Sequence, residues 1–568
     1  MSSPPLRIPA LNSVDEFRSA LVALGLNLPV DDRSLSAAEG SPLAAALTIG
    51  TLRIGNRWCI HPMEGWDGTA EGQPSEHTLR RWRNFGLSGA KLLWGGEAFA
   101  VRPDGRANPR QLCYRPENVG SLRELLTAAT SAHTEAYGPG ATDDLVIGLQ
   151  LTHSGRFCKP HRNDRFEPRV AYHHPVLDAK VGIAPDDDAC LWTDGEIRKL
   201  IEAYVVSAKA AHAAGFQFVD LKCCHGYLGH EFLSAFDRPG PYGGDFAGRT
   251  RFIREIVSAV RSECPGLEIG VRLSLWDTYA YRPDPALSQP GKLGPGIPVI
   301  PEGGGLYPVF GADRANPHRI DLTEPIELIR SLWEDHEVGL WNLTAGSPYY
   351  NPHVQRPAIY PPSDGYAPPE DPLVGCVRQI QAVREVCEFF REQQRAADVS
   401  PSCCATPERS TSSGDAGAAQ HGGLTSAARW PIFVGTAYTY FQEYLPHVAQ
   451  ALVRSGWVDS IGLGRMVLSD WQLPAKILAG SDFAADKKLC RTFSDCTTAP
   501  RNGIISGCFP LDPYYKQMPE AAELKRIKSA KSLGVATPRR SSNPNESSGR
   551  TEQACERDQI PTHFGSSG

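Results

Sequence analysis

Three side chains that can donate protons stand close together in VDLKCCHGY, residues 219–227. They are Lys222, His225 and Tyr227, and each can donate a hydrogen bond to a carbonyl oxygen or transfer a proton. A single histidine or tyrosine is most often structural, whereas three such donors at the end of one predicted strand indicate a site that acts on a substrate. We therefore interpret these three residues as candidate catalytic residues.

Two later segments, IFVGTAYT at 432–439 and IGLGRMVL at 461–468, place glycines at the ends of apolar runs. Glycine lets backbone N–H groups approach an anion, and an arginine offers a fixed fork of donors. Gly435, Gly464 and Arg465 are therefore candidates for a phosphate site. The alternative is that the two glycines only form tight turns.

Eight short apolar runs alternate with helical patterns between residues 48 and 482. The predicted strands are Trp58–Met63, Lys91–Ala98, Leu145–Thr152, Phe216–Lys222, Leu267–Ser274, Gly339–Thr344, Pro431–Gly435 and Ser460–Gly464. The predicted helices are Glu76–Phe85, Asp194–Ala214, Thr250–Ser262, Glu324–Asp335, Pro372–Arg391, Leu445–Ser455 and Leu473–Ala479. Near-continuous apolar runs are typical of strands covered on both faces. The alternation predicts an α/β fold, a (β/α)8 TIM barrel, with a doubly wound sheet as the alternative.

The residues at the predicted strand ends are polar or glycine. They are Glu64, Glu97, Gln150, Lys222, Arg272, Thr344, Gly435 and Gly464. In a (β/α)8 barrel the chemistry belongs at the carboxyl ends of the strands, and a phosphate often sits after the seventh and eighth. We therefore expect these residues to meet at one mouth of the barrel.

Composition and charge exclude several classes of protein. The chain has 568 residues, of which 41% are hydrophobic, and its 58 basic and 64 acidic residues give a net charge of −6. Such a chain is a poor candidate for binding nucleic acid or an anionic membrane surface. No apolar run is long enough for a transmembrane helix, and no signal peptide is visible at the N-terminus. We read the 15 scattered cysteines as reduced thiols and expect a cytoplasmic protein.

Changes in composition divide the chain. Residues 1–46 form an N-terminal extension that packs on another element or is mobile, and residues 47–516 form the barrel domain. A low-complexity insertion at 393–428 interrupts the barrel before its seventh strand, and residues 517–568 are expected to form a disordered tail.

Several segments, taken in order, resemble the Old Yellow Enzyme or NADH:flavin oxidoreductase family. The matching segments are HPMEG at 61–65, GGEAFAVRPDGR at 95–106, LQLTHSGR at 149–156, HGYLGHEFLS at 225–234, YGGDFAGRTRFIREIVSAVR at 242–261, GVRLS at 270–274 and IGLGR at 461–465. The resemblance implies a barrel that binds FMN without a covalent bond. NADH or NADPH is then the electron donor, and the partners are small molecules.

The resemblance also implies roles for individual residues. The flavin would be held by Pro62, Met63, Glu64, Ala98, Gln150, Arg272, Gly435, Gly464 and Arg465. Among these, Gln150 would bind the pyrimidine edge of the ring and Arg272 its N1–O2 edge, where a cation stabilises the anionic reduced flavin. Lys222 and His225 match the pair that binds the substrate carbonyl, and Tyr227 matches the proton donor.

Two positions depart from the family pattern. The family usually has Thr, Cys or Ser at position 64 and His at position 222, where this chain has Glu64 and Lys222. A carboxylate beside the flavin can disfavour its anionic reduced form or pair with a cation. A lysine can donate to an enolate oxygen, but as a flexible point charge.

Three cysteines after the barrel fit an iron–sulfur motif only in part. Larger relatives resembling 2,4-dienoyl-CoA reductase carry C-x2-C-x3-C-x11-C here and bind a [4Fe–4S] cluster. This chain has Cys490, Cys496 and Cys508, with Thr492 where the second ligand belongs. Because such clusters normally need four thiolates, we expect no intact cluster and no other metal.

The favoured function is an FMN-dependent oxidoreductase that passes hydride from NAD(P)H to an electron-poor acceptor such as an activated C=C. Two alternatives stay open. One is a barrel lyase or aldolase in which Lys222 forms a Schiff base. The other is a flavin-binding protein without catalytic activity.

Overall fold

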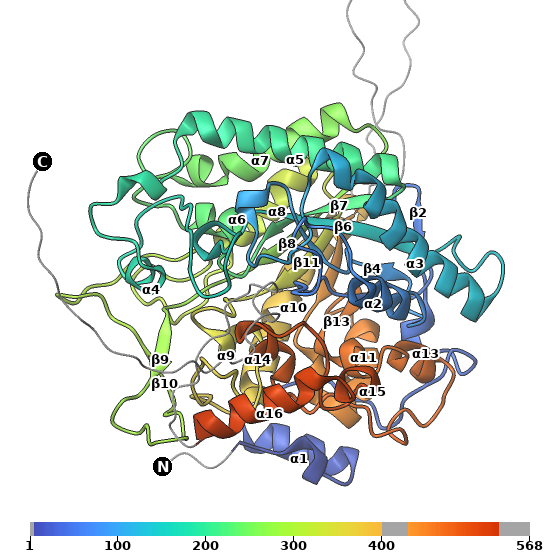
Figure 1. The fold of residues 1–568 in the computed structure, drawn as a ribbon. Coiled ribbons are helices and arrows are strands. Elements are labelled where there is room, and N and C mark those ends of the chain that lie inside the picture. The colour runs from blue at the N-terminus through green and yellow to red at the C-terminus, as the bar shows by residue number, and fades with distance from the viewer. Residues whose placement is uncertain (1–4, 400–429, 533–568) are drawn as a thin grey trace, which may run out of the picture.

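The computed structural model describes residues 5–399 and 430–532. In these residues eight parallel strands pair in a closed ring, which confirms the predicted (β/α)8 barrel and excludes the open sheet (Figure 1). The strands of the ring are β3 (Trp58–Ile60), β4 (Leu92–Leu93), β6 (Val146–Thr152), β7 (Phe218–Cys223), β8 (Glu268–Ser274), β11 (Leu340–Thr344), β12 (Ile432–Gly435) and β13 (Ser460–Leu463). A further strand, β5 (Ala98–Ala100), follows β4 and pairs with the upper part of β6.

Helices surround the barrel. They are α2 (Glu76–Gly86), α3 (Val119–Tyr137), α5 (Asp194–Ala214), α7 (Phe246–Glu263), α8 (Thr323–His336), α10 (Pro372–Val399), α11 (Leu445–Arg454) and α13 (Leu473–Leu478). Helix α5 shows why the ends of a helix can be predicted from the sequence. Thr193 and Glu196 form a capping box at its start, and Gly215 ends it in the left-handed region at φ 106°. Helix α3 was not among the predicted helices, although its buried residues Leu122, Leu125, Ala129 and Ala132 recur at helical spacing.

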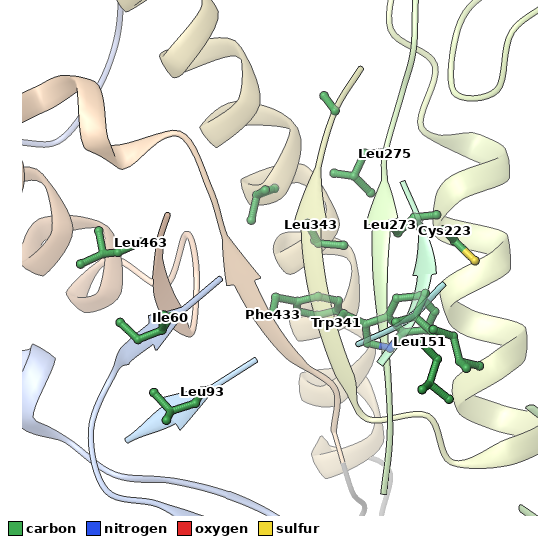
Figure 2. Close-up of a cluster of buried hydrophobic side chains, with 14 of the residues drawn as sticks. Ile60, Leu93, Leu151, Cys223, Leu273, Leu275, Trp341, Leu343, Phe433 and Leu463 are labelled. Carbon is green, nitrogen blue, oxygen red and sulfur yellow. The ribbon is translucent and has the colours of Figure 1, made fainter. Parts of the chain in front are cut away.

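The two faces of the strands differ in polarity. Figure 2 shows the outer face, where apolar side chains from successive strands pack toward the surrounding helices. The labelled residues include Ile60, Leu93, Leu151, Cys223, Leu273, Leu343, Phe433 and Leu463. Because side chains alternate along a strand, their neighbours Gln150, Lys222 and Arg272 point into the barrel.

The lower end of the barrel interior is closed by apolar side chains. The hairpin of β1 (Leu47–Ile49) and β2 (Leu52–Ile54) precedes the first barrel strand. Its residues Ile49 and Ile54 join Trp94, Phe218 and Leu340 in one buried cluster. With the lower end filled by apolar groups, the polar interior residues are confined to the carboxyl ends of the strands.

The N-terminal extension packs against the barrel domain. Helix α1 (Val14–Ala23) places Phe17 parallel to the ring of Tyr444, with centroids 4.5 Å apart. The backbone N–H of Leu6 donates to Asp371 at 2.7 Å. The sequence left open whether this extension packs on another element or is mobile, and its described residues pack on the barrel domain.

Short helices occupy the connections and the C-terminal part. They are α4 (Leu177–Val181), α6 (Leu228–Leu233), α9 (Pro352–Gln355), α12 (Arg465–Ser469), α14 (Asp495–Arg501), α15 (Pro513–Lys516) and α16 (Pro519–Ser532). A second small hairpin, β9 (Tyr281–Pro283) with β10 (Gly296–Pro298), lies in the connection from β8 to α8. None of the helices between residues 5 and 399 or 430 and 532 is long and apolar enough to cross a membrane.

Two sequence-based boundaries need correction. Helix α10 continues to Val399, so the first seven positions of the expected insertion at 393–428 are helical, and residues 400–428 lie outside the described residues. Helix α16 covers 519–532, where we expected a disordered tail. Its residues Leu524 and Ile527 are buried against Ala499 and Phe509, so this segment gains apolar contacts that composition alone did not reveal. The range 533–568 lies outside the described residues.

Candidate active site

The mouth at the carboxyl ends of the strands collects the polar residues that the sequence singled out. Gln150 on β6 is the register partner of Asp220 on β7, and Lys222 on β7 is the partner of Arg272 on β8. Ala98 on β5 pairs with Gln150 from the other side. One wall of the mouth is therefore built from adjacent strands, which fixes the spacing of these side chains.

The amide of Gln150 is oriented by a carboxyl group that the sequence analysis missed. Gln150 Nε2 donates to Asp220 Oδ2 at 2.6 Å, and both side chains are buried. Burial raises the pKa of Asp220 to about 7, although the bond from Gln150 opposes the shift. Asp220 stands two residues before Lys222, so strand periodicity was the signal that places both on the inner face.

Arg272 joins the wall to the loop after the first strand. Its Nη1 donates to the carbonyl oxygen of Pro62 at 3.0 Å, so the HPMEG segment is fixed over the mouth. Its Nε is buried and has no hydrogen-bond partner among the described residues. A buried guanidinium nitrogen without an acceptor fits a ligand that brings one, such as the N1–O2 edge of a flavin.

His61 fills the interior between the first and last strands. Asn342 Nδ2 donates to its Nδ1 at 3.0 Å. A Cβ atom on Gly462 would lie 2.0 Å from the ring, so only glycine fits at that position. Burial, and then the charge of Arg272, holds the pKa of His61 well below its usual range, so the ring is neutral. The sequence analysis did not assign this residue a role.

The three candidate catalytic residues lie together, as predicted, and Glu64 joins them. Tyr227 Oη donates a hydrogen bond to the carboxylate of Glu64. The Lys222 ammonium lies 3.8 Å from the centre of the Tyr227 ring, a cation–π contact. His225 Nε2 lies 3.2 Å from Thr344 Oγ1 and 3.4 Å from Gln355 Nε2.

A second tyrosine, which the sequence analysis missed, completes this cluster. Tyr349 Oη lies 2.8 Å from Tyr227 Oη. Because the Tyr227 hydrogen goes to Glu64, Tyr349 is the donor in this pair. The ring of Tyr349 stacks on Phe157 with centroids 4.1 Å apart, which fixes its position. Tyr349 follows β11 in a loop, so no pattern in its own segment could have identified it.

Burial shifts the pKa values of all three candidate catalytic residues. The pKa of Tyr227 is well above its usual value, first because of burial and then because of the charge of Glu64. Burial lowers the pKa of Lys222, and the charge of Glu64 opposes this. Burial, Arg272 and Lys222 hold the pKa of His225 well below its usual range. At neutral pH the cluster therefore offers a neutral imidazole and a protonated phenol.

At the other end of the mouth, the proposed phosphate residues lie at the end of β12 and directly after β13. Arg465 Nη2 donates to the carbonyl oxygen of Pro357 at 3.1 Å, and its Nη1 is buried without a partner among the described residues. A Cβ atom on Gly464 would meet only Met63 Sδ, at 3.9 Å, so space is open beside this glycine. Gly435 has a packing reason as well, because its Cβ would lie 2.1 Å from Tyr438 Oη.

The cysteines of the C-terminal part do not form a cluster site in the described residues. Cys490 and Cys496 are partly buried and Cys508 is buried. Thr492, at the position of the missing ligand, is buried, and its hydroxyl has no hydrogen-bond partner among the described residues. Nowhere in the described ranges do three or more His, Cys, Asp or Glu side chains converge as metal ligands would. Thr492 has no thiolate to offer a [4Fe–4S] cluster, so the absence of a cluster stays a prediction.

The fold and the mouth together define a (β/α)8 barrel whose polar residues gather at the carboxyl ends of the strands. Residues 42–285 match the sequence model of the NADH:flavin oxidoreductase / NADH oxidase family, which confirms the resemblance seen in the motifs.

Individual relatives agree over part of their length. The chain is 30% identical to an NADH:flavin oxidoreductase of Gibberella zeae over 33% of this chain and 45% of the relative. It is 25% identical to a putative 12-oxophytodienoate reductase of Oryza sativa subsp. japonica, over 43% of this chain and 62% of the relative. An NADPH dehydrogenase of Clostridium acetobutylicum is 28% identical to the chain, over 39% of this chain and 60% of the relative. The chain thus spans about half to three fifths of these relatives.

Solved structures share the fold. A structure of 2-naphthoyl-CoA reductase with 2-naphthoyl-CoA superposes with a TM-score of 0.54 at 16% identity, over 85% of this chain and 58% of that one. The 6-hydroxypseudooxynicotine amine oxidase of Pseudomonas geniculata N1 superposes with a TM-score of 0.52 at 18% identity, over 82% of this chain and 53% of that one. At these identities the likeness concerns the fold alone.

Proposed function

We propose that the protein is an FMN-dependent oxidoreductase that takes hydride from NADH or NADPH and passes it to an electron-poor acceptor such as an activated C=C. The observation that carries the proposal is the unpartnered, buried Nε of Arg272 beside the ordered amide of Gln150. These two groups offer a cation and a hydrogen-bond donor to the pyrimidine half of a flavin, within the part of the chain that matches the family.

In this proposal the residues of the mouth would hold FMN along its whole length. Gln150, Arg272 and the backbone at Ala98 would hold the pyrimidine edge, and Pro62, Met63 and Glu64 would border the ring. Arg465 and the backbone at Gly435 and Gly464 would hold the phosphate. When bound, FMN supplies a two-electron carrier that exchanges hydride with nicotinamide and with an acceptor.

The catalytic cluster would act on the acceptor. Lys222 and His225 donate hydrogen bonds to its oxygen and stabilise the negative charge that develops there. Tyr227 gives a proton to the carbon that does not receive hydride. Tyr349 donates to the Tyr227 oxygen, so it can support that oxygen as the proton leaves. Reduction of the cofactor by nicotinamide needs no acid from the protein.

An absorbance spectrum of the purified protein under anaerobic conditions tests the proposal. We expect a bound flavin whose visible absorbance bleaches on addition of NADH or NADPH and returns with an enone. Chromatography of the released flavin should give FMN in a one-to-one ratio with protein. Recovery of FAD, or a colourless protein that cannot be loaded with flavin, would contradict the proposal.

A further inference from the structure

Two neighbouring arginines carry buried hydrogen-bond donors that nothing in the described residues accepts. The atoms are Arg356 Nε, Arg356 Nη2 and Arg465 Nη1. Both side chains are nevertheless held in place. Arg356 Nη1 donates to Thr497 Oγ1, and Arg465 Nη2 donates to the carbonyl oxygen of Pro357. The bond to Pro357, the residue after Arg356, ties Arg465 to the backbone next to Arg356, and the two positive charges are close enough for Arg465 to lower the pKa of Arg356.

The charges around this pair do not neutralise it. Arg501 is close, but it forms its own ion pair with Asp364. Burial lowers the pKa of Arg356, the positive charges of Arg465 and Arg501 lower it further, and Cys496 and Asp364 only partly oppose this. Two adjacent cations with buried, unpartnered donors are costly unless an anion joins them. The arrangement is therefore that of a site for an anion with more than one negative charge.

We propose that Arg356 is a second ligand of the FMN phosphate, beside Arg465, and that the C-terminal part of the chain positions it through Thr497. This inference rests on the proposed function, because it takes FMN as the occupant. A phosphate monoester carries between one and two negative charges at neutral pH, and a guanidinium fork matches its oxygen atoms. The open side of Gly464 lies next to Arg465 and leaves room for the phosphate.

The proposal gives the C-terminal part a role that does not need a metal. Thr497 belongs to α14, which follows Cys490 and includes Cys496. Helix α14 also holds Arg501, which reaches the loop after β11 by donating to the carbonyl oxygen of Pro348. This segment thus contacts the β11 loop at two points and fixes Arg356, so it acts as a clamp on the phosphate end of the cofactor.

Comparison of FMN with riboflavin tests the proposal, because riboflavin has the same ring system and lacks the phosphate. Flavin-free protein is titrated with each flavin, and the quenching of flavin fluorescence gives the two dissociation constants. We expect Arg356→Gln to weaken FMN binding roughly 10- to 100-fold and to leave riboflavin binding unchanged. Unchanged riboflavin binding also shows that the variant is folded.

Thr497 is a positioning residue and needs its own variants. Thr497→Val removes the hydroxyl that accepts from Arg356, so it should also lower the preference for FMN over riboflavin, but by a smaller factor than Arg356→Gln. Thr497→Ser keeps a hydroxyl and should restore this preference. Thr498→Val is the matched control on the same helix, since Thr498 Oγ1 accepts from the backbone of Ser363 instead. This control should keep the wild-type preference.

The outcomes separate this inference from the proposed function. If wild-type protein binds FMN more tightly than riboflavin and Arg356→Gln keeps the same preference, Arg356 is not a phosphate ligand, whereas the proposed function stands. Equal loss of both flavins in Arg356→Gln would likewise overturn the inference, because it would indicate a structural role. If wild-type protein binds neither flavin, the proposed function itself fails.

Discussion

Tyr227 donates its hydroxyl hydrogen to the carboxylate of Glu64, a residue 163 positions earlier in the chain. The contact joins the loop after the first barrel strand to the segment after the fourth. Under the proposed function the contact sets a condition, because Tyr227 would have to leave Glu64 before it could protonate a substrate. Glu64 is one of the two positions at which this chain departs from the pattern that the resemblance implies.

Replacement of Tyr227 by Phe tests its role as proton donor. Loss of a general acid should slow flavin reoxidation by an enone roughly 10²- to 10⁴-fold. Reduction by NAD(P)H should be unchanged, since hydride transfer to the flavin needs no protein acid. Stopped-flow absorbance separates the two half-reactions. Tyr349→Phe keeps the ring stacked on Phe157 and removes only the donor to the Tyr227 oxygen, so it should have the smaller effect. Reoxidation of the Tyr227 variant at the wild-type rate would assign the proton to another group.

Replacement of Glu64 by Thr should make the flavin midpoint potential more positive. A carboxylate at the ring opposes the arrival of electrons, and its removal should shift the potential by on the order of 30 mV, equivalent to about 1.4 kcal/mol for two electrons. Equilibrium titration with a redox dye measures the shift. Glu124→Thr on the exposed side of α3 removes the same charge at a distance and should leave the potential unchanged. An unchanged or more negative potential in Glu64→Thr would show that this carboxylate does not act on the flavin.

Replacement of Lys222 by Met tests whether the lysine binds the acceptor. Met keeps most of the apolar length but removes the donor, so kcat/KM for an enone should fall roughly 10- to 100-fold through lost hydrogen bonding to a charged group. The rate of flavin reduction by NAD(P)H should stay the same. Lys209→Met on the exposed side of α5, where the lysine pairs with Glu263, is the control. Full loss of NAD(P)H oxidation with every acceptor, together with borohydride-trappable substrate on wild-type Lys222, would instead favour the Schiff-base alternative.

Iron and acid-labile sulfide assays on anaerobically purified protein test the cysteine interpretation. We expect neither above background, because Thr492 stands at one ligand position and the described cysteines do not converge on a metal site. About four irons per chain would contradict this and would require a ligand from outside the motif.

The fold was predictable because its signals are local. The eight apolar runs with polar ends identify the barrel strands, and caps such as Thr193 with Gly215 mark helix α5. Helix α3 was missed although Leu122, Leu125, Ala129 and Ala132 recur at helical spacing, so its signal was present in the sequence. Helix α16 was missed because its burial depends on partners such as Ala499.

Many residues of the site could be predicted from the sequence, but most of the contacts between them could not. Lys222, His225 and Tyr227 share one segment, so their proximity follows from the chain itself. The contact between Tyr227 and Glu64 and the support from Tyr349 join three separate strand ends, and side-chain rotamers decide them. The placement of Arg356 depends on Thr497, 141 positions later, and no spacing rule connects the two.

Replacement of Asp220 by Asn should change how stability depends on pH. Burial raises the pKa of Asp220 to about 7 from its usual value of 3.8, so the folded protein keeps this proton between those pH values while the unfolded chain loses it. The stability contributed by the protonated group is therefore complete below about pH 4 and is lost as the pH rises through 7, by on the order of 4 kcal/mol. Asn is neutral at every pH and can still accept the bond from Gln150.

In chemical denaturation of flavin-free protein, Asp220→Asn should match wild type near pH 4 and be the more stable protein at pH 8. Asp143→Asn, at an exposed carboxylate, should show no such divergence. Parallel stability curves for wild type and Asp220→Asn would show that Asp220 is already ionised in the folded barrel, with Gln150 and Arg272 as its compensating partners.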